Sequence, residues 1–141
     1  MQTNIQEAFV IHSKPYKETS LIVTFLCRSA GKISAVAKGA KRKKSKFSGQ
    51  LEPFQLLNID FRGKGNLKTL YLAETTNPYK DFISKENLYS GFYINELINF
   101  LLVQSDESEE LFQLYKESIE ELKTKEELEP ILRNFELDIL A

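Results

Sequence analysis

The 141-residue chain is poor in the residues that build disulfides, metal sites and many catalytic centres. Cys27 is the only cysteine, which excludes an intramolecular disulfide and a cysteine cluster for structural zinc, and suits a reducing compartment. His12 is the only histidine, and it lies in an apolar run without a recognisable nucleophile motif. We therefore expect no catalytic residues, no bound metal and no cofactor. His12, at the end of the first expected strand, is expected to be a structural or rim residue rather than a catalyst.

Long apolar segments are also missing. Residues 1–11 include Gln2, Asn4 and Glu7 and lack the basic start and apolar stretch of a secretion signal. The most apolar window, residues 97–103, is interrupted by Asn99 and is far shorter than the roughly 20 residues of a spanning helix. We expect a soluble, cytoplasmic protein that makes no use of a membrane.

Charge is distributed unevenly along the chain. Residues 1–80 hold fourteen Lys and Arg against five Asp and Glu, whereas residues 81–141 hold five against fifteen. Such asymmetry indicates a basic module for a polyanion joined to an acidic module with another task. We therefore expect two domains, residues 1–80 and residues 81–141.

The first of these domains is expected to be a small β-barrel. Short β-branched and aromatic runs alternate with turn residues, and only one connection, residues 39–52, is long. Five strands with a long third connection favour a five-stranded OB-fold, which binds nucleic acid, over an SH3-like barrel, whose long loop comes earlier. The expected strands are residues 5–12, 19–28, 32–38, 53–61 and 67–75.

The second domain is expected to be all α-helical. After Pro78 the apolar residues recur every three to five positions in three groups, which predicts three amphipathic helices. Pro130 fits only the first turn of the third helix. The last apolar repeat reaches Leu140 without a capping residue, so we expect a helical domain that is incomplete at its C-terminus. The expected N-terminal caps are Ser84, Asp106 with Glu109, and Thr124 with Glu127.

The strongest functional signal is a loop of six cations in nine residues, 38–46, with no acidic residue. Such a cluster gives salt-sensitive affinity for phosphates, although a solvated loop without function is the alternative. In an OB-fold the loops after the first and fourth strands flank the ligand, so we expect three basic loops to converge on one groove. The expected nucleic-acid-binding residues are Lys14, Lys17, Lys38, Lys41, Arg42, Lys43, Lys44, Lys46, Phe47, Arg62, Lys64 and Lys68.

Three further expectations concern individual side chains. Phe47, between Lys46 and Ser48, is the better candidate for stacking on bases, whereas Tyr71 is expected in the barrel core. Glu96 interrupts the apolar face of the first helix and is expected to be buried in an ion pair with a basic barrel residue. The acidic residues at 106–110 and 117–129 are expected on solvated helix faces rather than at a metal site.

The order of motifs along the chain resembles that of the bacterial recombination mediator family RecO. The resemblance covers nearly the whole chain and rests on eight segments. They are Tyr16-x-Glu18-x-Ser20, Gly31-Lys32-Ile33, Ala37-Lys38-Gly39-Ala40, Lys46-Phe47-x-Gly49-x-Leu51-x-Pro53-Phe54, Leu67-Lys68-x-Leu70 through Glu74, Tyr93-Ile94-Asn95-Glu96-Leu97, Leu111-Phe112-x-Leu114-Tyr115, and Arg133-x-Phe135-Glu136-Leu137.

The resemblance implies an N-terminal OB-fold, a helical domain, and a role at the nucleoid in recombinational repair of DNA damage. It implies binding of single- and double-stranded DNA, strand annealing, and, with the partner RecR, loading of RecA onto DNA coated by single-strand-binding protein. It implies no catalysis. Many family members carry a cysteine zinc site further along, which Cys27 alone does not provide.

Three other functions remain compatible with the residues themselves. One is an RNA-binding OB-fold protein of translation or RNA processing. Another is a hydrolase or transferase that uses His12. The third is an adaptor whose basic loop meets an acidic protein.

Overall fold

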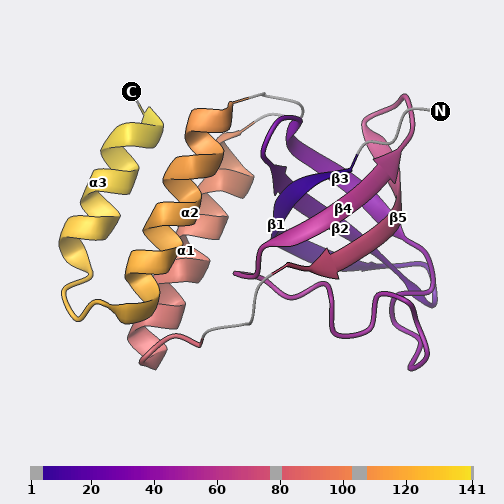
Figure 1. Cartoon of the computed structure of the whole chain (residues 1–141), viewed down its shortest axis with the longest axis horizontal. Helices are drawn as coiled ribbons and strands as arrows, with labels where there is room; N and C mark the ends of the chain where they lie inside the picture. The colour runs from indigo at the N-terminus through magenta and orange to yellow at the C-terminus, as the bar shows by residue number, and fades with distance from the viewer. Residues whose placement is uncertain (1–4, 77–80, 103–107, 141) are drawn as a thin grey trace.

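The protein folds as a β-barrel followed by three helices (Figure 1). The structure, a computed structural model, describes residues 5–76, 81–102 and 108–140. Five strands close the barrel in the order β1-β2-β3-β5-β4, with β3 and β5 parallel and the other neighbours antiparallel. The predicted OB-fold with a helical extension is confirmed. The strands are β1 (Ile5–Tyr16), β2 (Ser20–Cys27), β3 (Gly31–Ala37), β4 (Leu57–Arg62) and β5 (Leu67–Thr75).

The barrel interior is filled by alternate residues of each strand. In β2 and β3 the inward residues include Val23, Phe25, Ile33 and Ala35, all buried, because successive side chains of a strand point to opposite faces. Phe25 pairs with Ile33 and Val23 with Ala35, so these side chains lie level with one another inside the barrel. The same alternation places the intervening residues on the outer face.

Two strand boundaries differ from the sequence-based expectation by more than one residue. β1 continues to Tyr16, because Lys14 and Pro15 pair with β2 and the turn begins only at Lys17, whose φ is 55°. β4 begins at Leu57 rather than at residue 53, because Phe54 adopts a φ of 69° and interrupts the extended chain. Both differences arise where long-range pairing or packing overrides local strand propensity.

The helical part contains α1 (Lys85–Leu101), α2 (Glu109–Thr124) and α3 (Glu129–Leu140). The predicted cap of α1 is confirmed, since the Ser84 hydroxyl accepts a hydrogen bond from the Asn87 N–H. Ser108 caps α2, and the proposed cap at residue 106 lies outside the described residues. The Thr124 cap is wrong, because this residue ends α2; Pro130 occupies the first turn of α3, as expected.

A second apolar core joins the helices to the barrel. Phe9 of β1 contacts Phe112 and Tyr115 of α2, with ring centroids 5.5 and 5.0 Å apart. Leu26 of β2 is fully buried in the same cluster, which continues to Phe135 of α3. The helices therefore cover one part of the outer surface of the barrel (Figure 1). Within the described ranges, no helix is long and apolar enough to cross a membrane.

Polar contacts also fasten the two parts, but not through the expected residue. Glu96 is exposed, so the predicted buried ion pair is wrong. Its neighbour Asn95 is buried instead, and the Asn95 Oδ1 accepts a hydrogen bond of 2.6 Å from the Tyr115 hydroxyl, which joins α1 to α2. The basic barrel side chain that reaches α1 is Lys32, whose Nζ donates to backbone carbonyls at the end of that helix. A second lysine, Lys123 of α2, donates from the helical part to the carbonyl of Phe54, in the segment that precedes β4.

Candidate nucleic-acid interface

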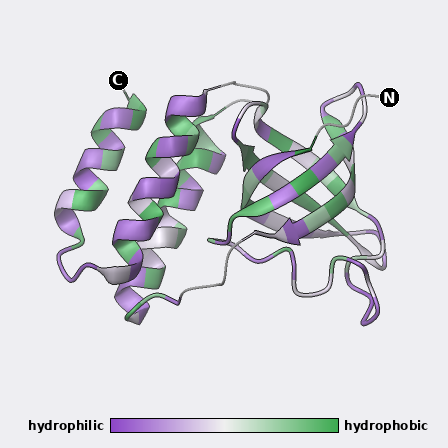
Figure 2. Ribbon diagram, in the orientation of Figure 1, coloured by the Kyte–Doolittle hydropathy of each residue, from purple (hydrophilic) through white to green (hydrophobic). Residues whose placement is uncertain are grey.

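The basic loop after β3 is a chain of tight turns. Backbone N–H groups of Ala40, Arg42, Ser45 and Ser48 each donate to the carbonyl three residues earlier. These bonds pair four N–H groups with four carbonyls along the loop, while the side chains of all six cations at 38–46 are exposed. The outermost part of the loop is coloured hydrophilic in Figure 2. The loop thus presents its charges on an ordered backbone.

Phe47 anchors this loop from inside the barrel. Its side chain is 2% exposed and belongs to the barrel core, together with partly buried Ala40 and Leu51 on either side of it. The expectation that Phe47 stacks on bases is therefore wrong, because its ring is not accessible. The reason is that an apolar ring closes the end of the barrel, where its burial is worth about 2–3 kcal/mol.

The turn between β1 and β2 lies directly beside the basic loop. The Lys41 N–H donates to the Thr19 carbonyl over 2.8 Å, and the Gly39 N–H donates to the Ser20 hydroxyl over 3.2 Å. Lys17 is exposed in this turn, and its Nζ lies 5.3 Å from the centre of the Tyr16 ring. Two of the three predicted basic loops therefore form one cationic surface.

The β4–β5 turn is placed differently. β3 and β5 run parallel and pair from Ser34 and Leu67 onward. Lys38 follows the paired residues of β3, whereas Lys64 precedes those of β5, so the two lysines lie beyond opposite ends of the paired segment. Lys64 is exposed, and the Lys68 Nζ donates to the Gly63 carbonyl within the same turn. Figure 1 shows the β4–β5 turn and the basic loop at opposite ends of the barrel. The expected convergence of all three loops at one point is therefore wrong.

A band of the outer barrel face connects the two ends. Strand pairing places five residues side by side across all five strands, because residues paired across a sheet share a face. In order across the barrel the band is Lys14, Ile22, Val36, Thr69 and Arg62. The first and last of these residues, Lys14 and Arg62, are both exposed and both belong to the predicted nucleic-acid-binding set.

Tyr71 lies on this outer face and is 44% exposed, so its predicted place in the core is wrong. It shares the outward direction of Thr69, two residues earlier in β5, because strand side chains alternate. The Arg62 guanidinium carbon lies 4.6 Å from the centre of the Tyr71 ring. An exposed aromatic ring beside a cation has the chemistry to stack on a base while the cation meets a phosphate.

The chain's single histidine and single cysteine both lie in strands of the barrel. His12 is exposed, but it pairs with Thr24 within β1 and does not lie at the end of that strand. Cys27 is fully buried in the barrel core, and burial raises the pKa of its thiol to about 12. Within the described ranges, no group of three or more His, Cys, Asp or Glu residues could hold a metal ion.

A closed OB barrel with a cationic loop and an attached helical bundle defines the architectural class of this chain. Two family models match it: "Recombination protein O N terminal" over residues 1–79 and "Recombination protein O C terminal" over residues 85–141. The chain belongs to the RecO family.

Curated relatives named "DNA repair protein RecO" agree with this assignment. The relative from Idiomarina loihiensis is 42% identical over 96% of this chain and 58% of its own length. Those from Haemophilus influenzae (strain Rd) and Nitrosospira multiformis are 39% and 44% identical over 99% and 96% of this chain, and over 59% and 55% of their own lengths. The chain therefore spans less than two thirds of the length of these relatives.

Proposed function

We propose that this chain is a non-enzymatic DNA-binding and strand-annealing factor of recombinational DNA repair. In this proposal residues 1–80 bind single- and double-stranded DNA, while residues 81–141 form the helical domain. With RecR, the protein helps to load RecA onto DNA coated by single-strand-binding protein. Family membership supports the repair role, and the relatives' shared name mentions repair.

The observation that carries the proposal is the junction of the basic loop with the β1–β2 turn through the Lys41 N–H and the Thr19 carbonyl. This contact brings Lys17 beside the cations of residues 38–46. A strand bound there would continue across the outer band toward Arg62 and Tyr71, where one cation and one aromatic ring are exposed together. Affinity would come mainly from phosphates, because the loop offers no Asn or Gln for paired contacts to bases.

Annealing follows from the same chemistry. Two complementary strands repel each other through their phosphates, and a cationic surface that holds both lowers this repulsion without selecting sequence. The acidic residues of the helical part, fifteen Asp and Glu in residues 81–141, would keep DNA on the barrel side.

The test is an annealing assay with complementary strands coated by single-strand-binding protein. We expect this chain to accelerate annealing, and a variant with Lys41, Arg42 and Lys43 changed to Ala to lose most of that acceleration. A control variant with Lys116 and Lys125 of the helical part changed to Ala should retain it. Failure to bind or anneal DNA at low salt would refute the proposal, and clear preference for an RNA of the same sequence would favour an RNA-binding function instead.

A further inference from the structure

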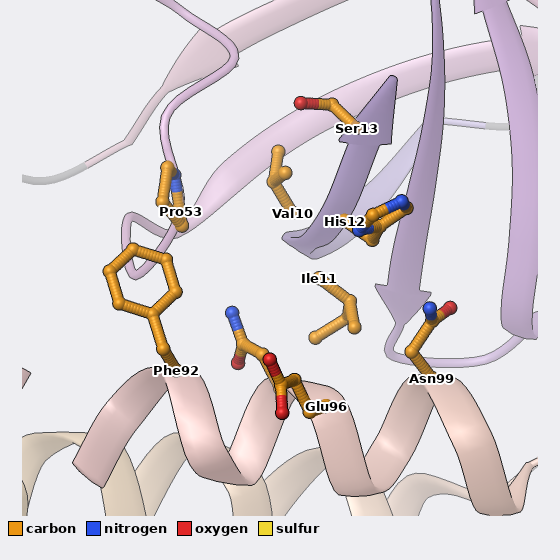
Figure 3. Close-up of a pocket in the computed structure, with 9 residues that line it drawn as sticks. Val10, Ile11, His12, Ser13, Pro53, Phe92, Glu96 and Asn99 are labelled. Carbon is orange, nitrogen blue, oxygen red and sulfur yellow. The ribbon is translucent and has the colours of Figure 1, made fainter. Parts of the chain in front are cut away.

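A pocket lies where β1 leaves the helix-covered surface of the barrel. It has a volume of about 250 Å³ and lies between β1, Pro53 and the face of α1 that carries Phe92, Glu96 and Asn99. Figure 3 shows these three side chains on α1 facing the strand that carries Ile11 and His12. None of these α1 residues belongs to the interface described above.

A bulge in β1 shapes the pocket. The pairing of β1 with β2 shifts register between Val10 and His12, and such a bulge re-aims the side chains around it. Before the bulge, Phe9 packs beneath the helices; after it, His12 and Lys14 are exposed. The pocket is therefore at the border between the helix-covered surface and the open outer face.

Asn95 provides a buried hydrogen-bond donor that lacks a partner. Its side chain is 2% exposed and lines the pocket, and its Nδ2 makes no hydrogen bond within the described part of the chain. Its orientation is set by Tyr115, a fully buried residue whose hydroxyl donates to the Asn95 Oδ1 over 2.6 Å. A buried N–H without a partner costs about 1–3 kcal/mol, which a ligand with an acceptor atom would relieve.

The other residues that line the pocket suit a flat ring that carries hydrogen-bonding atoms on its edge. The exposed Glu96 also lines the pocket, so the lining offers a hydrogen-bond acceptor as well as the Asn95 donor. Phe92 is 42% exposed and, with Pro53 and Val10, supplies an apolar wall. Every nucleobase carries a hydrogen-bond donor next to an acceptor on its pairing edge, together with two apolar faces.

We propose that this pocket receives one unpaired nucleobase of the bound single strand. Asn95 donates to the acceptor on the pairing edge of the base, Glu96 accepts from the neighbouring donor, and the ring lies against Phe92. Lys14, two residues after His12 on the exposed part of β1, meets the adjoining phosphate. This inference rests on the proposed DNA binding and adds a site that requires an unpaired base.

A peptide with a basic side chain would also meet an acceptor at Glu96. The nucleobase is favoured because the exposed outer face of β1 leads from the pocket through Lys14 toward Tyr16 and the basic loop. Placing a base in the pocket also costs less free energy in single-stranded DNA than in a duplex, because the base need not be unpaired first. The pocket thus provides a physical reason for a preference for single strands.

The test compares a short oligodeoxycytidylate with a phosphodiester of the same length that carries no bases, across a range of salt concentrations. We expect Glu96→Gln and Phe92→Leu each to reduce the preference for the base-bearing strand, Phe92→Leu by roughly tenfold, as for loss of one stacked base. The slope of log affinity against log salt should stay unchanged, because the phosphate contacts remain.

Two matched variants serve as controls: Tyr89→Leu, an exposed aromatic of α1 that does not line the pocket, and Glu120→Gln on α2. Both should retain the wild-type preference, and circular dichroism should show that all four variants are folded. If Glu96→Gln strengthens binding of both strands equally, the carboxylate acts only by repulsion and the pocket proposal fails. Salt-dependent binding without any preference for bases would also refute the pocket while leaving the proposed function intact, whereas no binding of either strand refutes both.

Discussion

The Nζ of Lys32, in β3, lies 2.9 Å from the carbonyl oxygen of Leu102, which caps the C-terminus of α1. It also donates to the Asn99 carbonyl over 2.7 Å. The last turn of α1 contains no basic residue of its own, so a cation from the barrel compensates the negative end of the helix dipole. Lys32 is 7% exposed, and burial lowers the pKa of its ammonium group. This contact fixes the end of α1 on the barrel.

The first prediction concerns this contact. Lys32→Met keeps most of the aliphatic chain but leaves the two helix carbonyls without their donor, so the free energy of unfolding should fall by about 1–3 kcal/mol. Urea denaturation measures the change. Lys43→Met, in the exposed part of the basic loop, is the control and should stay within about 0.5 kcal/mol of wild type. Equal stability of the two variants would contradict a fastening role for Lys32.

The second prediction concerns Phe47. Because its ring fills the end of the barrel, Phe47→Ala should lower the free energy of unfolding by about 3–5 kcal/mol. Phe100→Ala, at an 87% exposed position, should change it by less than about 0.5 kcal/mol. Phe47→Leu should cost less than Phe47→Ala and should leave DNA affinity nearly unchanged. A Phe47→Leu variant that is stable but has lost DNA affinity would restore the base-stacking role.

The third prediction concerns the mode of DNA binding. Replacing Lys41, Arg42, Lys43, Lys44 and Lys46 with Ala should reduce the slope of log affinity against log salt by roughly three units, using about 0.7 per phosphate and about four phosphates contacted. Binding to single-stranded DNA is measured between low and moderate salt. A single substitution should have little effect.

The matched control for this prediction replaces Lys85, Lys116 and Lys125, three cations of the helical part, and should leave the slope as in wild type. An unchanged slope in the five-residue variant would place the basic loop outside the DNA path. A loss confined to particular sequences would mean that the loop contacts bases.

The fourth prediction concerns pH. Burial raises the pKa of the Tyr115 phenol above its ordinary value of about 10. Above pH 10 the phenol loses its proton in the unfolded chain but keeps it in the folded chain. The contribution of this group to the free energy of unfolding is therefore complete below pH 10 and is lost as the pH rises. Between pH 10 and 11, Tyr115 should therefore contribute a fall in unfolding free energy approaching about 1.4 kcal/mol per pH unit.

Denaturation at several pH values compares wild type with two variants. Tyr115→Phe should be less stable at pH 7 by about 1–3 kcal/mol, because the Asn95 Oδ1 loses its donor, yet it should show a shallower decline above pH 10. Tyr89→Phe, at an exposed position, should decline as wild type does. Parallel curves for wild type and Tyr115→Phe would contradict the assignment.

Local sequence patterns were sufficient for the order of the elements. Turn residues and alternating apolar residues predicted five strands, and the single long connection after the third strand predicted the OB topology that the barrel has. Ser84 was recognisable as a helix cap because the capping hydrogen bond spans only three residues. The cations of residues 38–46 are all exposed, because charged side chains are rarely buried in a protein interior. These features depend on neighbours in the sequence, so the amino-acid sequence alone determines them.

The accessible face of each element was decided only by tertiary structure. Phe47 stands between Lys46 and Ser48 and Tyr71 between Leu70 and Leu72, yet the first is buried at the end of the barrel and the second is exposed, because strand register and the barrel end decide which ring is covered. Asn95 and Glu96 are adjacent in α1, and the rotation of that helix against Tyr115 decides that the amide is buried and the carboxylate exposed. Periodicity shows that an element has two faces, but which face is covered depends on contacts between residues far apart in the chain.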